Sequence, residues 1–209
     1  MSDTILYDYW RSTASYRVRI ALNLANIKYQ STSIDLLQGE HLTDAHLEKH
    51  PQGLVPVLDI DGKRFTQSLA IIDYLNSTHD LRLLPADPAL RATVRALSYT
   101  IAMDVHPVCN LSVVGYATNG LEPARTEWMQ HFISKGLGAF EQQLKTFESS
   151  KFCVGNNISM ADLCLIPQLY NANRWGVDYS DHTRIKGVAE HCATLEAFEM
   201  ATPENVRRA

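Results

Sequence analysis

Three hydroxyl side chains and an arginine lie close together in the segment 10–17. Ser12, Thr13 and Ser15 stand between a strand-like run and a helical run, so we expect them at a helix N-terminus. Such a terminus exposes unpaired N–H groups and a partial positive charge, which stabilise an anion and lower the pKa of a thiol placed there. A helix cap explains any one of these hydroxyls, but it does not explain three of them together with Arg11. Because no histidine stands nearby in the sequence to activate them, we expect the hydroxyls to donate to an anion rather than to act as nucleophiles.

Two further positions have residue types suited to binding a peptide-like ligand. Gln67 and Ser68 place side-chain donors at the start of a second helical run, where they could hold a carboxylate or simply cap the helix. The Val55-Pro56 bond opens a strand, although a proline there forfeits a hydrogen bond of the sheet. A cis bond that presents the Val55 backbone to a peptide would explain the proline, while a trans bond is the commoner state.

Alternating and helical patterns predict the elements that position these residues. Strands are expected over 4–7, 29–34, 55–60 and 63–66, and helices over 17–25 and 68–75 with Ser68 as N-cap. The helix between the first two strands predicts that they are parallel. Asp61-Gly62 predicts a hairpin between the last two. The first 80 residues are therefore expected to form β-α-β followed by β-β-α.

The pattern becomes helical after a proline-rich stretch, Leu84-Pro85-Ala86-Asp87-Pro88, that indicates a linker. Helices are expected over 91–114 (bent near Pro107), over 122–148, after a capping box at 159–162, and over 182–200. We therefore predict an α/β domain at 1–84, a linker at 85–90 and an all-helical domain at 91–209.

Composition and charge exclude several classes of protein. Of the 209 residues, 45% are hydrophobic and 20% are charged, which is typical of a globular chain and argues against disorder. The net charge is −4, and the only tight basic clusters are Arg17/Arg19 and Arg207/Arg208, so we expect no nucleic-acid partner. No apolar run is long enough to span a bilayer, and the N-terminus has no targeting pattern. We therefore expect a cytoplasmic protein with no membrane partner.

The cysteines do not suggest a metal site or disulfides. The four are Cys109, Cys153, Cys164 and Cys192. None belongs to a C-x-x-C pair and none has a histidine at zinc-ligand spacing, so we expect no metal. Free, buried thiols in a reducing compartment are the simplest interpretation. No cysteine lies in the first 108 residues, so a reactive sulfur in the first domain would have to come with a cofactor.

The longest motif resembles a known family. Residues 12–22, Ser-Thr-Ala-Ser-Tyr-Arg-Val-Arg-Ile-Ala-Leu, are similar to the Ser-Ser-Cys-Ser-Trp-Arg-Val-Arg-Ile-Ala-Leu motif of zeta-class glutathione transferases. The similarity extends over essentially the whole chain, through the segments 67–75, 83–85, 110–113 and 160–165. It implies the cytosolic glutathione transferase fold: a thioredoxin-like α/β N-terminal domain and an all-α C-terminal domain. Ala14 and Thr13 depart from the motif, because the family has cysteine and serine there, whereas Ser12 keeps the family's first serine.

The resemblance also implies roles for individual residues. Ser12 is expected to donate to the glutathione thiolate, with Thr13 and Ser15 beside it. The residues implied to bind glutathione are Ser12, His41, Val55, Pro56, Gln67, Ser68 and Asp104. Among them, His41 aligns with a family glutamine near the glycyl end, and Asp104 is implied to reach across a homodimer interface. Arg11, Asn110 and Arg174 are implied to bind the substrate.

The resemblance implies a glutathione-dependent cis–trans isomerisation of maleylacetoacetate to fumarylacetoacetate, a step of tyrosine and phenylalanine breakdown. The substrate is a small diacid, and glutathione serves as a cofactor that is not consumed. Maleylpyruvate isomerases are close relatives that also lack the motif cysteine and also have a His-Pro pair like His106-Pro107, but they have arginines where this chain has Leu111-Ser112. A general transferase or dehalogenase acting on haloacids is another alternative. A non-catalytic binding protein is disfavoured by the intact Ser12 turn and Gln67-Ser68.

Overall fold

The fold is that of a computed structural model, in which residues 4–148 and 150–208 are described. The chain divides into two units, one formed by Met1–Leu81 together with Leu195–Ala209 and the other by Arg82–Thr194. In the described part of the chain, no helix has the length and apolar character needed to cross a membrane.

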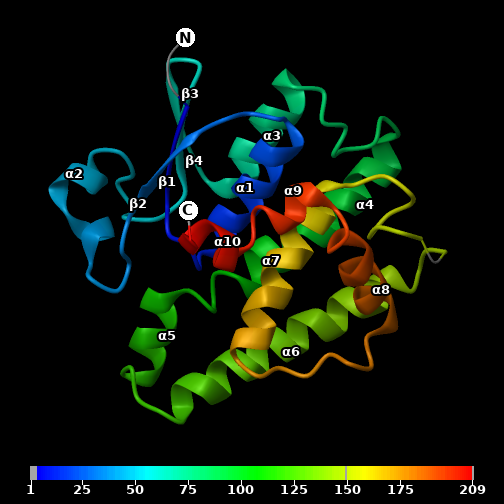
Figure 1. Ribbon diagram of the computed structural model, residues 1–209. Coiled ribbons are helices and arrows are strands. Elements are labelled where there is room, and N and C mark those ends of the chain that lie inside the picture. Colours follow the sequence, from blue (N-terminus) through cyan, green and yellow to red (C-terminus); the bar gives the residue numbers. More distant parts are fainter. Residues whose placement is uncertain (1–3, 149, 209) are drawn as a thin grey trace. The chain divides into compact units, whose positions relative to one another are not determined.

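Four short strands form the sheet of the first unit (Figure 1). They are β1 (Ile5–Asp8), β2 (Gln30–Ser33), β3 (Val57–Ile60) and β4 (Lys63–Thr66), in the order β2-β1-β3-β4. The first two strands are parallel, as predicted. Strand β3 pairs antiparallel with β4, as expected of the predicted hairpin, and it also pairs antiparallel with β1. Asp61 and Gly62 both have positive φ, 53° and 71°, the conformation of a two-residue hairpin turn, so the predicted hairpin is confirmed.

Two helices of the first unit, α1 (Thr13–Leu24) and α3 (Ser68–Thr78), pack side by side (Figure 1). Of the predicted apolar face, Val18, Ala21 and Leu22 are fully buried, whereas Ala25 is half-buried and is the C-cap of α1. Arg17 and Arg19 are buried as well, at 1% and 0% exposure, so this basic cluster belongs to the interior rather than to the surface. The prediction that Ser68 caps α3 is wrong by one position, because Gln67 occupies the N-cap.

The segment between β2 and β3, which showed no apolar period in the sequence, contains two short helical turns. They are a 3-10 turn at Glu40–Leu42 and α2 (Asp44–Leu47). Elements this short bury too few apolar side chains to leave a periodic signal. His46 and His50 are nevertheless buried there.

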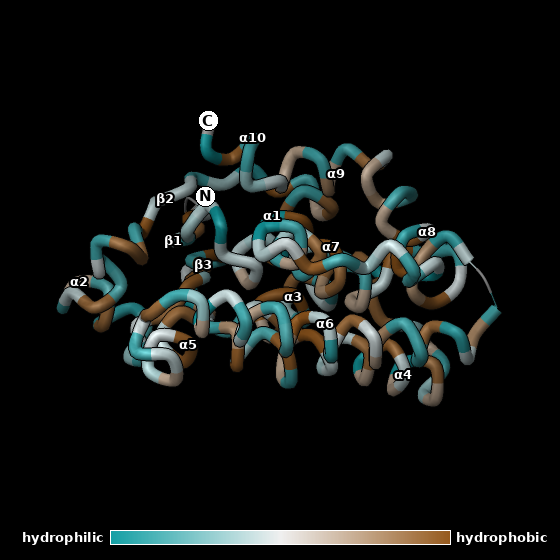
Figure 2. Tube along the Cα trace, turned by 90° about the horizontal axis from the view of Figure 1, so that it is seen from below, coloured by the Kyte–Doolittle hydropathy of each residue, from teal (hydrophilic) through white to brown (hydrophobic). Residues whose placement is uncertain are grey.

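The second unit consists of helices, as predicted. They are α4 (Pro88–Tyr99), a π-helical segment (Thr100–Val105), α5 (Leu111–Thr118), α6 (Ala124–Leu144), α7 (Met160–Arg174) and α8 (Thr183–Cys192). In Figure 2, α4 and α6 alternate between hydrophobic and hydrophilic colours along their length, as expected of amphipathic helices. The core residues of this unit include Ile133, Leu137 and Phe140 of α6, which are fully buried.

The prediction of one bent helix over 91–114 is wrong. After α4 the helix continues as the π-helical segment, which ends at Val105. Helix α5 begins only after a turn, with Asn110 as its N-cap. Pro107 lies in that turn and cannot donate a backbone hydrogen bond, so it ends the helix rather than bending it.

The predicted capping box of α7 is confirmed. The Asp162 carboxylate accepts from the backbone N–H of Ser159 at 2.8 Å and from its hydroxyl at 2.7 Å. It also accepts from the Cys153 N–H at 2.8 Å. Burial nevertheless raises the pKa of Asp162, and these donors oppose the shift. The helix start is therefore tied to the loop before it.

The prediction of a final helix over 182–200 is wrong. Helix α8 ends at Cys192, Leu195 is extended, and α9 (Glu196–Glu199) and α10 (Pro203–Arg208) follow. Asn23 donates to the Ala197 carbonyl at 3.0 Å and Arg19 to the Ala201 carbonyl at 3.0 Å, so tertiary contacts attach this segment to α1. The structure therefore groups Leu195–Ala209 with the first unit, whereas the sequence-based division placed these residues in the helical domain.

Candidate functional site

The register of the sheet brings three features of the sequence to one edge of the first unit. Tyr7, near the end of β1, pairs with Val57 at the start of β3, and Val57 pairs with Thr66 at the end of β4. The turn that contains Ser12, Thr13 and Ser15, called the hydroxyl turn below, follows β1. Pro56 precedes β3, and Gln67 follows β4. Pro56 and Gln67, which follow Ser12 by 44 and 55 positions in the sequence, therefore lie at the same edge as the hydroxyl turn.

The hydroxyl turn has the predicted helix-start geometry. Ser12 is the N-cap of α1, and its Oγ accepts from the Ser15 N–H at 3.1 Å. Since the Ser12 oxygen accepts, its hydroxyl hydrogen can donate to a further group, so capping and anion binding are compatible. Thr13 is buried at 7% exposure and Ser15 at 0%. Among the described residues, the Ser15 Oγ has no hydrogen-bond partner.

Arg11 is held beside this turn by two aromatic rings. Its Nη2 donates to the Tyr9 hydroxyl at 2.9 Å, and its guanidinium carbon lies 4.6 Å from the centre of the Trp10 ring. The Arg11 Nε is buried and has no hydrogen-bond partner among the residues that the structure describes. A guanidinium held in this way is a preorganised donor for a carboxylate.

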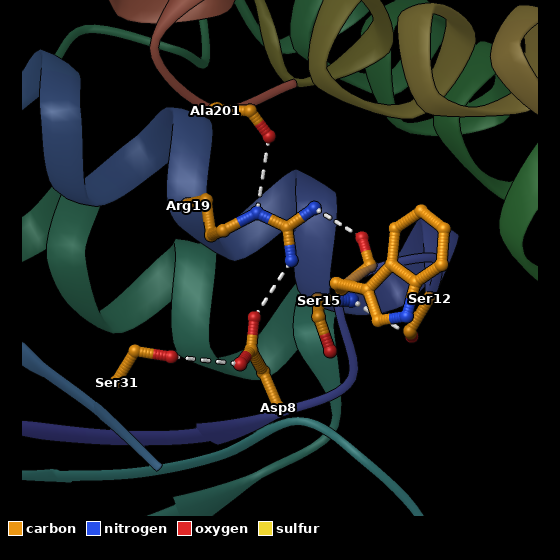
Figure 3. A network of polar contacts seen from close by, with 7 residues as sticks. Asp8, Ser12, Ser15, Arg19, Ser31 and Ala201 are labelled. Atoms are coloured by element: carbon orange, nitrogen blue, oxygen red, sulfur yellow. Dashed lines mark hydrogen bonds and ion pairs between the residues drawn. The ribbon is translucent and has the colours of Figure 1, made fainter. Parts of the chain in front are cut away.

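A buried ion pair lies beneath the turn (Figure 3). Arg19 donates to the Asp8 carboxylate at 2.7 Å, and both side chains are almost fully buried. Ser31 donates to the other oxygen of Asp8 at 3.0 Å. Arg19 also donates to the Trp10 carbonyl at 3.0 Å, so this network joins β1, β2, α1 and the turn that holds Ser12.

The second helix start, at Gln67 and Ser68, has donors but no side-chain cap. Gln67 is exposed, has a positive φ of 67°, and donates through Nε2 to Gln52 Oε1 at 3.3 Å. Ser68 is buried and accepts from Arg17 at 3.2 Å. In the described part of the chain, no side-chain hydrogen bond caps α3, so its first N–H groups are available to an anion.

The Val55-Pro56 peptide bond is cis, so the sequence-based hypothesis of a cis bond is confirmed. The loop before it contains His41 in the 3-10 turn Glu40–Leu42. The neighbouring His46 lies with Nε2 2.9 Å from the Leu54 carbonyl oxygen, which ties the loop to the cis bond. Burial lowers the pKa of His41, and the nearby His46 lowers it further.

The other three predicted site residues lie on the second unit. Asp104 is exposed in the π-helical segment, and Asn110 is the N-cap of α5. Arg174 is the last residue of α7 and is exposed, with its guanidinium carbon 5.2 Å from the centre of the Trp175 ring.

The protein's own thiols are poorly suited to act as thiolates. All four cysteines are free and buried. Burial raises the pKa of the Cys109 thiol to about 12, and the pKa values of Cys153 and Cys192 also lie well above their usual range because of burial. At pH 7, a pKa of about 12 leaves on the order of one molecule in 100,000 as thiolate. Across residues 4–148 and 150–208, no group of three histidine, cysteine or acidic side chains could hold a metal ion.

Sequence reasoning missed three residues that shape this edge. Arg17 and Arg19 appeared only as a basic cluster, and Gln52 was not singled out. The signal for the arginines was their position: both flank Val18 in the apolar helical run 17–25. Charged side chains so placed are buried only when they are paired.

Two family models match the sequence. One describes the N-terminal domain of glutathione S-transferases and matches residues 6–83, and the other describes their C-terminal domain and matches residues 104–198. The chain belongs to the glutathione S-transferase family. The fold predicted from the resemblance is therefore confirmed.

Individual relatives support the resemblance to the zeta class of this family. The maleylacetoacetate isomerase of Rhizobium meliloti (strain 1021) is 54% identical over 210 residues, which cover 99% of each chain. A holo structure of maleyl pyruvate isomerase, a bacterial zeta-class glutathione S-transferase, has a TM-score of 0.93 and 37% identity, over 96% of this chain and 97% of that one. A structure of maleylacetoacetate isomerase from Anaeromyxobacter dehalogenans has a TM-score of 0.86 and 35% identity, over 97% of this chain and 95% of that one. It has dicarboxyethyl glutathione and citrate bound in its active site.

Proposed function

We propose that this protein catalyses the glutathione-dependent isomerisation of maleylacetoacetate to fumarylacetoacetate. The observation that carries the proposal is the meeting of the Ser12 turn, the cis-Pro56 bond and Gln67-Ser68 at one edge of the sheet. These features match the three parts of glutathione: a thiol, a peptide backbone and a γ-glutamyl carboxylate. The relative from Rhizobium meliloti that is 54% identical is named for this activity.

Each part of glutathione has a proposed partner in the first unit. The Ser12 hydroxyl donates to the sulfur, and Thr13 and Ser15 complete the helix start around it. The Val55 backbone beside Pro56 pairs with the cysteinyl residue. The remaining contacts of the first unit are assigned as follows: Gln67 and Ser68 to the γ-glutamyl carboxylate, and His41 to the glycyl end.

The chemistry requires a thiolate that adds reversibly to the substrate. Glutathione held by Ser12, Val55 and Gln67-Ser68 would supply a thiolate for reversible conjugate addition to the substrate alkene. The electron pair of the C=C bond would move to the conjugated carbonyl oxygen, the resulting single bond could rotate, and return of the pair would re-form the double bond and release the thiolate unchanged. The protein's task is to keep the thiol ionised at neutral pH. The Ser12 hydroxyl and the N-terminus of α1 do this because both stabilise negative charge on sulfur.

The diacid substrate needs cationic anchors for its carboxylates. We assign this role to Arg11 of the first unit and to Arg174 of the second, with Asn110 as a further polar contact. Guanidinium groups suit the role because they bind carboxylates through two parallel hydrogen bonds. Accordingly, we assign glutathione binding to the first unit and the substrate contacts other than Arg11 to the second unit.

Maleylpyruvate is the alternative substrate, because a structure similar to this chain is a maleyl pyruvate isomerase. Leu111 and Ser112 favour maleylacetoacetate, since they supply no second cation beside Asn110. The test is to incubate the protein with glutathione and each cis acid in turn and to follow the conversion of the cis isomer to the trans isomer by liquid chromatography. S-methylglutathione, whose sulfur is blocked, is the control. Faster turnover of maleylpyruvate would favour the alternative, and turnover of neither acid, with release of halide from a haloacid, would indicate a dehalogenase.

We also propose that the protein is a homodimer in which Asp104 faces the partner's glutathione. The supporting observation is that apolar side chains are exposed on α4 and on the π-helical segment: Leu90 at 38%, Tyr99 at 39% and Met103 at 61% exposure. Asp104 follows Met103 directly. Sedimentation at micromolar concentration should give twice the chain mass, and a single-chain mass would contradict the proposal. We place the protein in the cytoplasm, where glutathione is abundant and free thiols stay reduced.

A further inference from the structure

A buried guanidinium lies directly behind the start of α3. Arg17, on α1, is 1% exposed, and its Nη1 donates to the Ser68 Oγ at 3.2 Å. Ser68 is itself 7% exposed and is the first residue of α3. A permanent positive charge therefore lies one hydrogen bond away from a helix N-terminus.

This contact decides how the Ser68 hydroxyl can be used. A guanidinium can only donate, so the Ser68 oxygen must accept from it. The hydroxyl hydrogen must then point to some other acceptor, and the described part of the chain offers it none. Ser68 is thus left as a donor for a group from outside the chain.

The surroundings of Ser68 favour an anion as that group. No side chain among the described residues caps α3, and the Gln67 side chain is turned toward Gln52. The free N–H groups of the first turn and the Arg17 charge both stabilise negative charge at this point. A buried guanidinium also loses little to solvent screening.

We propose that Arg17 is a positioning residue that fixes Ser68 as a hydrogen-bond donor to the γ-glutamyl carboxylate of glutathione. This inference rests on the proposed function, since it places that carboxylate at the start of α3. Arg17 acts through Ser68 and does not contact the reacting sulfur, which lies at Ser12. Loss of Arg17 should therefore weaken glutathione binding and raise KM for glutathione, while kcat at saturating glutathione stays unchanged.

The test measures glutathione binding by isothermal titration calorimetry in four variants. They are Arg17→Lys, Ser68→Ala, the double variant, and Val18→Ala as a matched control. Val18 is fully buried on the same helix and has no polar side-chain atom, so its truncation lowers stability without removing a hydrogen bond to Ser68. We expect Arg17→Lys and Ser68→Ala each to weaken binding about tenfold, the double variant to be no weaker than Ser68→Ala, and Val18→Ala to bind like the parent.

A comparison of two ligands tests the proposal even if the Arg17 variant does not fold. Glutathione whose γ-glutamyl carboxylate is replaced by an amide should bind the parent at least tenfold more weakly, and Ser68→Ala should not weaken it further. Equal affinity of the parent for glutathione and this amide overturns the proposal even if Arg17→Lys does not fold. If the factors by which Arg17→Lys and Ser68→Ala weaken glutathione binding multiply in the double variant, the positioning role of Arg17 is overturned, while the role of Ser68 stands. A parent protein that binds no glutathione overturns the proposed function as well.

Discussion

Replacing Arg19 with methionine should destabilise the protein by most of its folding free energy. Arg19 is fully buried and donates three hydrogen bonds: to the Asp8 carboxylate at 2.7 Å and to the Trp10 and Ala201 carbonyls at 3.0 Å. Removing one partner of a buried ion pair costs about 3–5 kcal/mol, because the other charge is left uncompensated. Each carbonyl that loses its donor adds about 1 kcal/mol. The sum, about 5–7 kcal/mol, compares with a total stability of about 5–15 kcal/mol for a typical protein.

Urea denaturation of a double-mutant cycle would test this value. The cycle compares Arg19→Met, Asp8→Asn and the double variant by the free energy of unfolding. Asp8→Asn removes the negative charge that Arg19→Met leaves unpaired. The double variant should therefore be about 2 kcal/mol more stable than Arg19→Met alone. A loss of less than about 1 kcal/mol for Arg19→Met, or a double variant less stable than Arg19→Met, would refute the reasoning.

Four further predictions concern the site and its supports. Ser12→Ala should raise the pKa of bound glutathione and lower kcat about tenfold at pH 7; an unchanged ultraviolet titration of the bound thiol would count against its role. Arg174→Ala should raise KM for the diacid while glutathione binding, measured by calorimetry, stays unchanged; equal loss of both would contradict its assignment. Glu141 is buried, and its carboxylate accepts two backbone N–H groups at the start of α8, at 3.2 and 3.0 Å. Glu141→Gln should therefore cost about 2–3 kcal/mol in urea denaturation, and a loss below about 0.5 kcal/mol would refute this. Burial lowers the pKa of His41 and of His50, so the unfolded chain binds protons more readily and stability should fall as the pH drops below about 6.5. Thermal midpoints between pH 7.5 and 5.5 measure this, and His50→Gln should flatten the dependence; a parent curve that is already flat would contradict it.

Local patterns were sufficient to predict several turns and helix starts. Three features depend only on residues within four positions of one another: the helix start at Ser12, the hairpin at Asp61-Gly62 and the capping box at Ser159. The local sequence is therefore enough to predict them. The long motif around Ser12 further supported a resemblance whose family the comparisons confirmed.

The elements that were predicted wrongly depend on contacts made over longer distances. Nothing local shows that the chain after α8 turns back to join α1, because the decisive bonds run from Asn23 and Arg19 to the carbonyls of Ala197 and Ala201. The sequence predicted a bend at Pro107 and not the break that the structure has, because whether a proline bends or ends a helix depends on what packs around it.

The sequence by itself determined which chemical groups this protein has: hydroxyls and N–H donors at two helix starts, a proline before β3, and no thiol in the first 108 residues. Only the tertiary structure decided that these groups meet, because the pairing of Tyr7 with Val57 and of Val57 with Thr66 sets which loops share an edge. It also decided that Arg17 and Arg19 are internal. A buried guanidinium is tolerable only beside groups that accept its hydrogen bonds, and those groups come from distant parts of the chain.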